Sequence, residues 1–88
     1  MDILIRNNLA DVYGQRECVD RAIRDALMDG EGSCTVSVVE PAESLDWHFI
    51  LVAADGIPRP VTIAWWEQFD WHNLPQTITR KLRLLLVA

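Results

Sequence analysis

Three extended segments separated by short turns occupy the middle of this chain, and they constrain its fold more than any other feature. They span residues 33–40, 45–54 and 61–66. In the first, apolar side chains alternate with others, which predicts a strand with one buried face. In the second, both sides are apolar, which indicates a central strand. Turn-forming residues at 41–44 and at Asp55-Gly56 join the segments, so we expect neighbouring antiparallel strands.

An amphipathic segment precedes these strands. An apolar stripe at three-and-four spacing runs from Val12 to Leu27, and charges of both signs fill the opposite face. Asp29-Gly30 provides the glycine that commonly ends a helix. Gly14 disfavours a helix interior by about 1 kcal/mol relative to alanine. The helix therefore begins either before Gly14 or near Gln15, with residues 8–13 as a separate turn.

A second amphipathic segment follows the strands. Asn73 and Pro75 are typical of a helix start. An apolar stripe then follows, formed by Leu74, Ile78, Leu82 and Leu85. The alternation of residues 82–86 would also suit a strand, which would give a ferredoxin-like variant.

Residues 3–5 add a short apolar first strand. We therefore predict a single α+β domain over residues 1–88, with the order β-α-β-β-β-α. It has a mainly antiparallel four-stranded sheet and two helices.

Composition favours a domain that folds without staples. Half of the 88 residues are hydrophobic, which suffices for one core. The two cysteines, Cys18 and Cys34, are fewer than a small secreted domain usually carries, so we expect free thiols that act as buried fillers. No amino-terminal signal pattern and no membrane-length apolar run is apparent. We expect a cytoplasmic protein without a membrane partner.

The acidic charge is concentrated in one part of the chain. The formal net charge is −5, and residues 29–70 hold eight acidic residues against Arg59 alone. Residues 71–88 hold three basic residues and no acidic one. Such a field repels nucleic acid and attracts basic surfaces, although surface charge also serves solubility. We therefore expect a protein partner with a basic surface and no direct binding of nucleic acid.

An aromatic and acidic segment, residues 65–72, is the most distinctive local feature. If Trp65 and Trp66 lie on a strand, they face opposite sides, so one can be buried while the other stays exposed. If both sheet faces are covered, the indoles belong to the core. Exposed tryptophans are enriched at binding hot spots, and nearby carboxylates pair with partner arginines or lysines. The candidate partner-binding residues are Glu40, Glu43, Asp46, Trp66, Glu67, Asp70 and Trp71.

No residue pattern indicates catalysis or a cofactor. His48, His72 and the two cysteines lack the spacing of zinc sites. Glu40 and Glu43 are near neither a nucleophile nor an evident pocket. The glycines do not form a phosphate-binding loop. We predict no catalytic residue, metal or cofactor. A small enzyme with its pocket at a dimer interface is the weaker alternative.

These features together predict a small acidic, non-enzymatic protein that binds and inhibits a basic macromolecular partner. An acidic face can imitate the phosphate backbone of a nucleic acid. Size, charge and the lack of motifs resemble those of small phage-encoded inhibitors such as anti-CRISPR proteins, although no stretch matches a family motif. The alternative is an accessory or immunity-type subunit that binds through its aromatic patch. Association into a homodimer through an exposed edge strand or indole is a further possibility.

Overall fold

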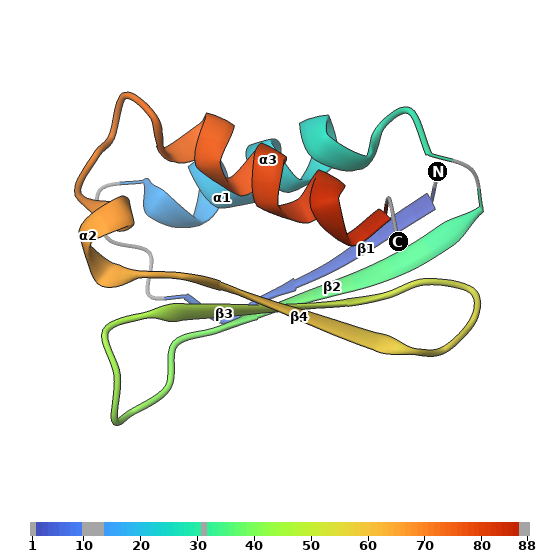
Figure 1. The fold of residues 1–88 in the computed structure, drawn as a ribbon, viewed down its shortest axis with the longest axis horizontal. Coiled ribbons are helices and arrows are strands. Elements are labelled where there is room, and N and C mark those ends of the chain that lie inside the picture. The colour runs from blue at the N-terminus through green and yellow to red at the C-terminus, as the bar shows by residue number, and fades with distance from the viewer. Residues whose placement is uncertain (1, 10–13, 31, 87–88) are drawn as a thin grey trace.

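The computed structural model describes residues 2–9, 14–30 and 32–86, which form a two-layer α+β sandwich (Figure 1). The sheet is one layer, and α1 and α3 lie against each other on one of its faces. The elements in chain order are β1 (Asp2–Asn7), α1 (Gln15–Leu27), β2 (Ser33–Val39), β3 (Trp47–Val52), β4 (Pro58–Ile63), α2 (Trp65–Gln68) and α3 (Leu74–Leu86).

The sheet has the order β1-β2-β3-β4 and is mixed. β1 pairs with β2 in parallel, whereas β2–β3 and β3–β4 are antiparallel. The predicted four-stranded α+β domain is confirmed, but the prediction of a mainly antiparallel sheet is wrong. The cause is α1, because a helical crossover returns the chain to the end where the preceding strand began and makes the two strands parallel.

Both long helices occur where apolar stripes predict them. α1 begins at Gln15, after Gly14 adopts the left-handed conformation at φ 72°. This confirms the later of the two predicted starts, while Val12 and residues 10–13 lie outside the described residues. Residues 74–86 form a helix, so the strand alternative for the chain end is wrong.

A short third helix, α2, was not predicted. The sequence assigned Trp65 and Trp66 to a strand ending at residue 66, but β4 ends at Ile63. The turn into α2 is stabilised by side chains that accept hydrogen bonds from its first backbone amides. Glu67 Oε1 accepts from Ala64 N at 3.0 Å, and Asp46 Oδ1 accepts from Trp65 N at 2.9 Å. The prediction of two helices is therefore corrected to three in the described part of the chain.

The hydrophobic core lies between the sheet and the pair α1 and α3. Alternate residues of β2 and β3 point into it, as the sequence pattern predicts. Trp47 and Cys34 belong to this core, whereas Cys18 is only partly buried. The largest fully buried side chains are Phe49, Leu9, Ile23, Leu27, Leu51, Ile63, Leu74, Ile78 and Leu82.

The opposite face of the sheet carries no helix in the described residues (Figure 1). Strand register arranges most of its side chains in three rows that each cross at least three strands. The rows are Leu4, Thr35, Val52 and Pro58; Arg6, Ser37, Ile50 and Pro60; and Val39, His48 and Thr62. This open face is partly apolar and partly polar, in contrast to the core face.

Candidate protein-binding surface at α2

Large apolar side chains are exposed in and beside α2. We call them the α2 cluster, and their exposed fractions run from 45% to 70%. The members are Leu45, Trp65, Trp66, Phe69 and Trp71. The ring of Trp65 packs edge-to-face against Trp66 and Phe69, with centroid separations of 5.9 and 6.0 Å. This is a preferred geometry of aromatic pairs, so three of the rings support one another at the surface.

Both adjacent tryptophans are exposed because they lie on a helix. Trp65 is 47% exposed and Trp66 is 63% exposed, so the strand-based prediction that one is buried is wrong, and so is the alternative that both belong to the core. The indole in the core is Trp47, which is 2% exposed. The sequence analysis missed Trp65, Phe69 and Leu45 as candidate site residues. The four-residue spacing of Trp65 and Phe69, typical of one helix face, is the signal that could have identified the pair.

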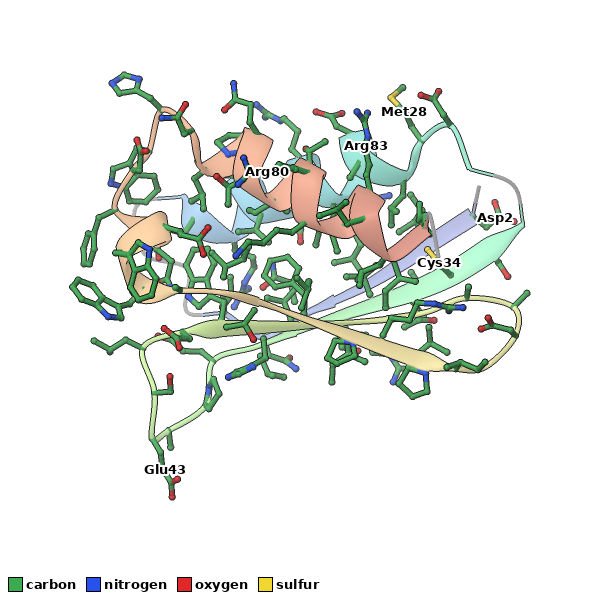
Figure 2. The ribbon with its side chains drawn as sticks, in the orientation of Figure 1. Asp2, Met28, Cys34, Glu43, Arg80 and Arg83 are labelled. Atoms are coloured by element: carbon green, nitrogen blue, oxygen red, sulfur yellow. The ribbon has the colours of Figure 1, made fainter. Side chains whose placement is uncertain are left out.

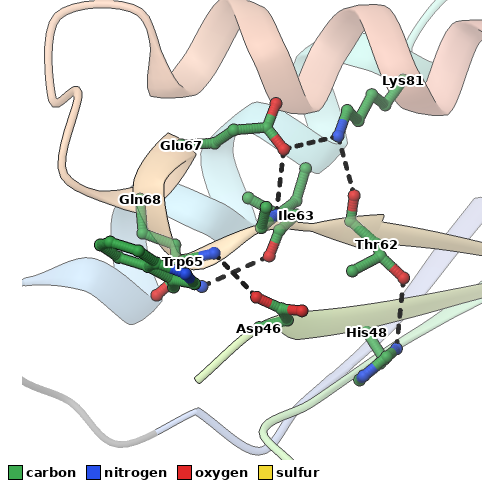
Figure 3. A network of polar contacts seen from close by, with 9 residues as sticks. Asp46, His48, Thr62, Ile63, Trp65, Glu67, Gln68 and Lys81 are labelled. Atoms are coloured by element: carbon green, nitrogen blue, oxygen red, sulfur yellow. Dashed lines mark hydrogen bonds and ion pairs between the residues drawn. The ribbon is translucent and has the colours of Figure 1, made fainter. Parts of the chain in front are cut away.

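Hydrogen bonds fix the backbone under the α2 cluster (Figure 3). Gln68 Nε2 donates to the carbonyls of Leu45 at 2.7 Å and Ile63 at 3.3 Å. Together with the Asp46–Trp65 bond, these contacts connect α2 to both the β2–β3 loop and the end of β4. The exposed rings therefore project from a platform held to two other segments by hydrogen bonds.

A lysine from α3 completes this platform. Lys81 Nζ lies 2.7 Å from Glu67 Oε1 and donates to the carbonyl of Thr62 at 2.8 Å. The Lys81 and Glu67 side chains are 25% and 20% exposed. Burial opposes ionisation of Glu67, but the bonds from Lys81 and the Ala64 amide outweigh it and lower the pKa of this carboxyl. The Glu67 carboxylate is therefore ionised at neutral pH.

The predicted acidic residues have two different structural roles. Asp46 and Glu67 accept hydrogen bonds that hold α2, and Asp70 Oδ2 accepts one from Asn73 Nδ2 at 2.9 Å. Glu40 and Glu43 lie on the loop between β2 and β3, are exposed, and form no ion pair or side-chain hydrogen bond within the described residues. Glu43 points away from the body at the loop tip (Figure 2).

The structure therefore brings Asp46, Trp66 and Glu67 together at α2. Trp71 is exposed three residues beyond this helix, and Glu40 and Glu43 belong to the loop at the same end of the sheet. The free carboxylates and the aromatic rings thus share one end of the molecule.

The two histidines and Cys34 lie in different surroundings. His48 Nδ1 lies 3.3 Å from Thr62 Oγ1 on the open sheet face, and His72 is exposed. Burial raises the pKa of the Cys34 thiol, which makes its thiolate scarce at neutral pH. Among residues 2–9, 14–30 and 32–86, no three potential metal-ligating side chains form a group. No helix within those ranges has the length and apolarity needed to cross a membrane.

Comparison of the chain with protein families, with curated proteins and with solved structures finds no match. The geometry of the α2 end is therefore the basis for proposing a function.

Proposed function

We propose that this protein is a non-enzymatic binding protein that docks its α2 cluster into an apolar groove of a partner protein with a basic rim. One observation carries the proposal: five large apolar side chains, each at least 45% exposed, lie in or beside a single short helix. Tryptophan is costly to leave in water and is enriched among the residues that dominate binding energy.

The rigidity of α2 favours tight binding. Each aromatic side chain can bury roughly 150–250 Å² of surface. The α2 backbone is already fixed through Asp46, Glu67 and Gln68, so association does not require ordering a flexible segment. The edge-to-face contacts of Trp65 also restrain two neighbouring rings. Most of the conformational entropy of this segment is therefore already lost on folding, before the partner binds.

The charges around the cluster favour a basic partner. Glu40 and Glu43 are exposed and form no ion pair within the described residues, whereas Lys81 is neutralised by Glu67. Unpaired carboxylates attract arginine and lysine side chains and raise the rate of encounter with a basic surface. In this proposal the rings supply affinity and the loop carboxylates supply orientation.

A second candidate function is inhibition of a protein that binds nucleic acid. One end of the molecule combines flat aromatic rings with free carboxylates, much as a single strand presents bases beside phosphates. Proteins that bind single strands use basic grooves and aromatic platforms. Under this function, the nucleic acid and this protein compete for one site on the partner.

Photo-crosslinking in cells of the native host tests the first function. Benzoylphenylalanine replaces Phe69 in the test variant and Ile57 in the control variant. Ile57 is 57% exposed and lies in the β3–β4 turn, at the far end of the sheet. We expect a discrete crosslinked protein, identified by mass spectrometry, only from position 69. A further Trp66→Ala substitution should reduce that product.

The identified partner then separates the two functions. Fluorescence anisotropy measures the partner's binding to a labelled single-stranded oligonucleotide while this protein is added. Displacement of the oligonucleotide supports inhibition, whereas simultaneous binding supports a docking role alone. Equal crosslinking from positions 57 and 69, or crosslinking unaffected by Trp66→Ala, would contradict docking through the α2 cluster.

A further inference from the structure

The outer edge of β1 presents backbone groups available for strand pairing. The amides of Asp2 and Asn8 donate to the carbonyls of Gly32 and Val38, so the even-numbered residues of this strand face β2. Alternation along a strand directs the N–H and C=O groups of Ile3 and Ile5 to the opposite side. Within the described residues, neither Ile3 nor Ile5 donates to or accepts from another residue at that edge.

The other edge of the sheet is closed. The carbonyl of Thr62 accepts from Lys81, which shows that it points away from β3. Pro58 and Pro60 have the same parity as Thr62, and proline has no N–H to donate. A further strand would therefore find two missing donors and an occupied acceptor along β4. Strand addition is favoured at β1 alone.

The side chains of β1 indicate which strand fits there. Asp2, Leu4 and Arg6 lie on the open face and are exposed, with Leu4 at 53%. In the described structure neither the Asp2 carboxylate nor the Arg6 guanidinium has an ion-pair or hydrogen-bond partner. Asp2 and Arg6 are equally far from Leu4. When the segment is paired with an antiparallel copy of itself, each acidic residue therefore lies opposite a basic one.

We propose that two copies of this chain pair β1 with β1 in antiparallel orientation about a two-fold axis at Leu4. Asp2 then lies opposite Arg6 of the second copy, and Arg6 lies opposite the second copy's Asp2. Ile3 and Ile5 form the hydrogen-bonded pairs, with four backbone bonds across the interface. Leu4 meets its own copy at a non-hydrogen-bonded position, where side chains are closest.

The parity of the backbone supports this register. Pairing centred on Leu4 needs the edge groups of Ile3 and Ile5 to face outward and those of Leu4 to face inward, as the bonds to β2 establish. The pairing joins two four-stranded sheets into one of eight strands. Since α2 follows β4 at the opposite edge, the dimer leaves both α2 clusters free and becomes bivalent.

Charge exchange tests the register directly. Sedimentation equilibrium of the purified full chain measures the dimer dissociation constant. Asp2→Arg and Arg6→Asp should each weaken the dimer on the order of tenfold, because like charges then lie opposite each other twice. The double variant should regain the wild-type constant. An equimolar mixture of the two single variants should form heterodimers, because their charges are complementary.

Matched leucine substitutions control for effects on folding. Leu4→Lys should abolish dimerisation, while Leu84→Lys should not, although Leu84 on α3 is similarly exposed at 66%. Circular dichroism and thermal melting verify that each variant is folded. A wild type that stays monomeric at millimolar concentration, or a double variant no tighter than the single ones, would overturn the proposal. Crosslinking from position 69 is independent of this outcome.

Discussion

The two edges of the sheet are built in opposite ways. At the β4 edge, Pro58 and Pro60 remove two outward donors, and Lys81 occupies the carbonyl of Thr62. At the β1 edge, the outward groups of Ile3 and Ile5 are free of partners in the described structure. Natural proteins usually blunt exposed edges to prevent unwanted pairing. Because the β4 edge is blocked and the β1 edge is not, we infer that the β1 edge pairs with another strand.

Closure of β4 also supports the proposed binding surface. Lys81 donates to the Thr62 carbonyl of β4 and pairs with Glu67 of α2, and Glu67 in turn accepts from the Ala64 amide at the start of this helix. Lys81 thus both blocks the β4 edge and holds α2, which carries the exposed rings. At the β1 edge the side-chain contact lies at the strand's end, where Asn7 Nδ2 donates to the Arg16 carbonyl and to Asp20 Oδ1 of α1. The outward backbone groups of Ile3 and Ile5 have no such cover in the described residues, so the two edges should respond differently to substitution.

Replacing Lys81 with methionine should have the largest effect. Lys81→Met keeps the apolar stem but removes the donors to Glu67 and Thr62. It leaves a mostly buried carboxylate without its ion pair, so we expect a loss of about 1–3 kcal/mol in the free energy of unfolding. Urea denaturation measures it. Arg83→Met, on the exposed side of α3, is the matched control and should change little. Equal losses in both variants would show that the contact is not specific.

The pH dependence of stability sharpens the same comparison. Because the folded pKa of Glu67 is lowered, its pairing stabilises the protein above the unfolded pKa of about 4.3 and is lost as pH falls through the folded value. The difference in unfolding free energy between wild type and Lys81→Met should be constant at neutral pH and shrink below about pH 4. Denaturation curves at a series of pH values measure this difference. A difference that does not change with pH would assign the effect of Lys81 to its bond with Thr62.

The sequence predicted the elements whose burial follows a simple period. Alternation located β2 and β3, and the three-and-four stripe located both long helices. It did not predict that β1 is parallel to β2, because pairing direction depends on how α1 crosses over, and we gave greater weight to the short turns between later strands. Leu9 is fully buried although it lies outside any periodic pattern.

The candidate site was predicted only in part. The sequence identified the aromatic segment, but strand alternation gave the wrong geometry for Trp65 and Trp66. The helix there depends on hydrogen bonds that the Asp46 and Glu67 carboxylates accept from backbone amides, and the Asp46 bond spans nineteen residues of sequence. Local propensity contains no information on such a contact. For the same reason, Asp46 and Glu67 could be proposed from sequence as partner-binding carboxylates without any sign that each already accepts a backbone hydrogen bond.

Opening the β4 edge should have a smaller effect. Pro60→Thr restores an outward N–H on the β4 edge, and it is combined with Leu4→Lys so that β1 pairing is blocked. We expect weak new self-association in sedimentation velocity with little change in monomer stability. Leu4→Lys alone is the control and should remain monomeric. If the combined variant is also monomeric, the lack of an N–H at Pro60 is not what prevents strand pairing at β4. The Lys81–Thr62 bond would then be the main obstacle to pairing.

The turn that leads into β4 should give the smallest effect. Asp55 pairs with Arg59 across the β3–β4 turn, and Asp55 Oδ1 also accepts from Ile57 N at 3.0 Å. The Arg59 bond lowers the pKa of Asp55 to about 2. Because the folded pKa is depressed, the stabilisation is present above the unfolded pKa of Asp and disappears as pH falls toward 2. Both groups are accessible to solvent, so screening weakens the pair.

Asp55→Asn should therefore leave the urea midpoint at neutral pH nearly unchanged. Any difference from wild type should be reduced further by salt. A loss as large as that of Lys81→Met would mean that β4 is held at its turn as firmly as at the α2 end.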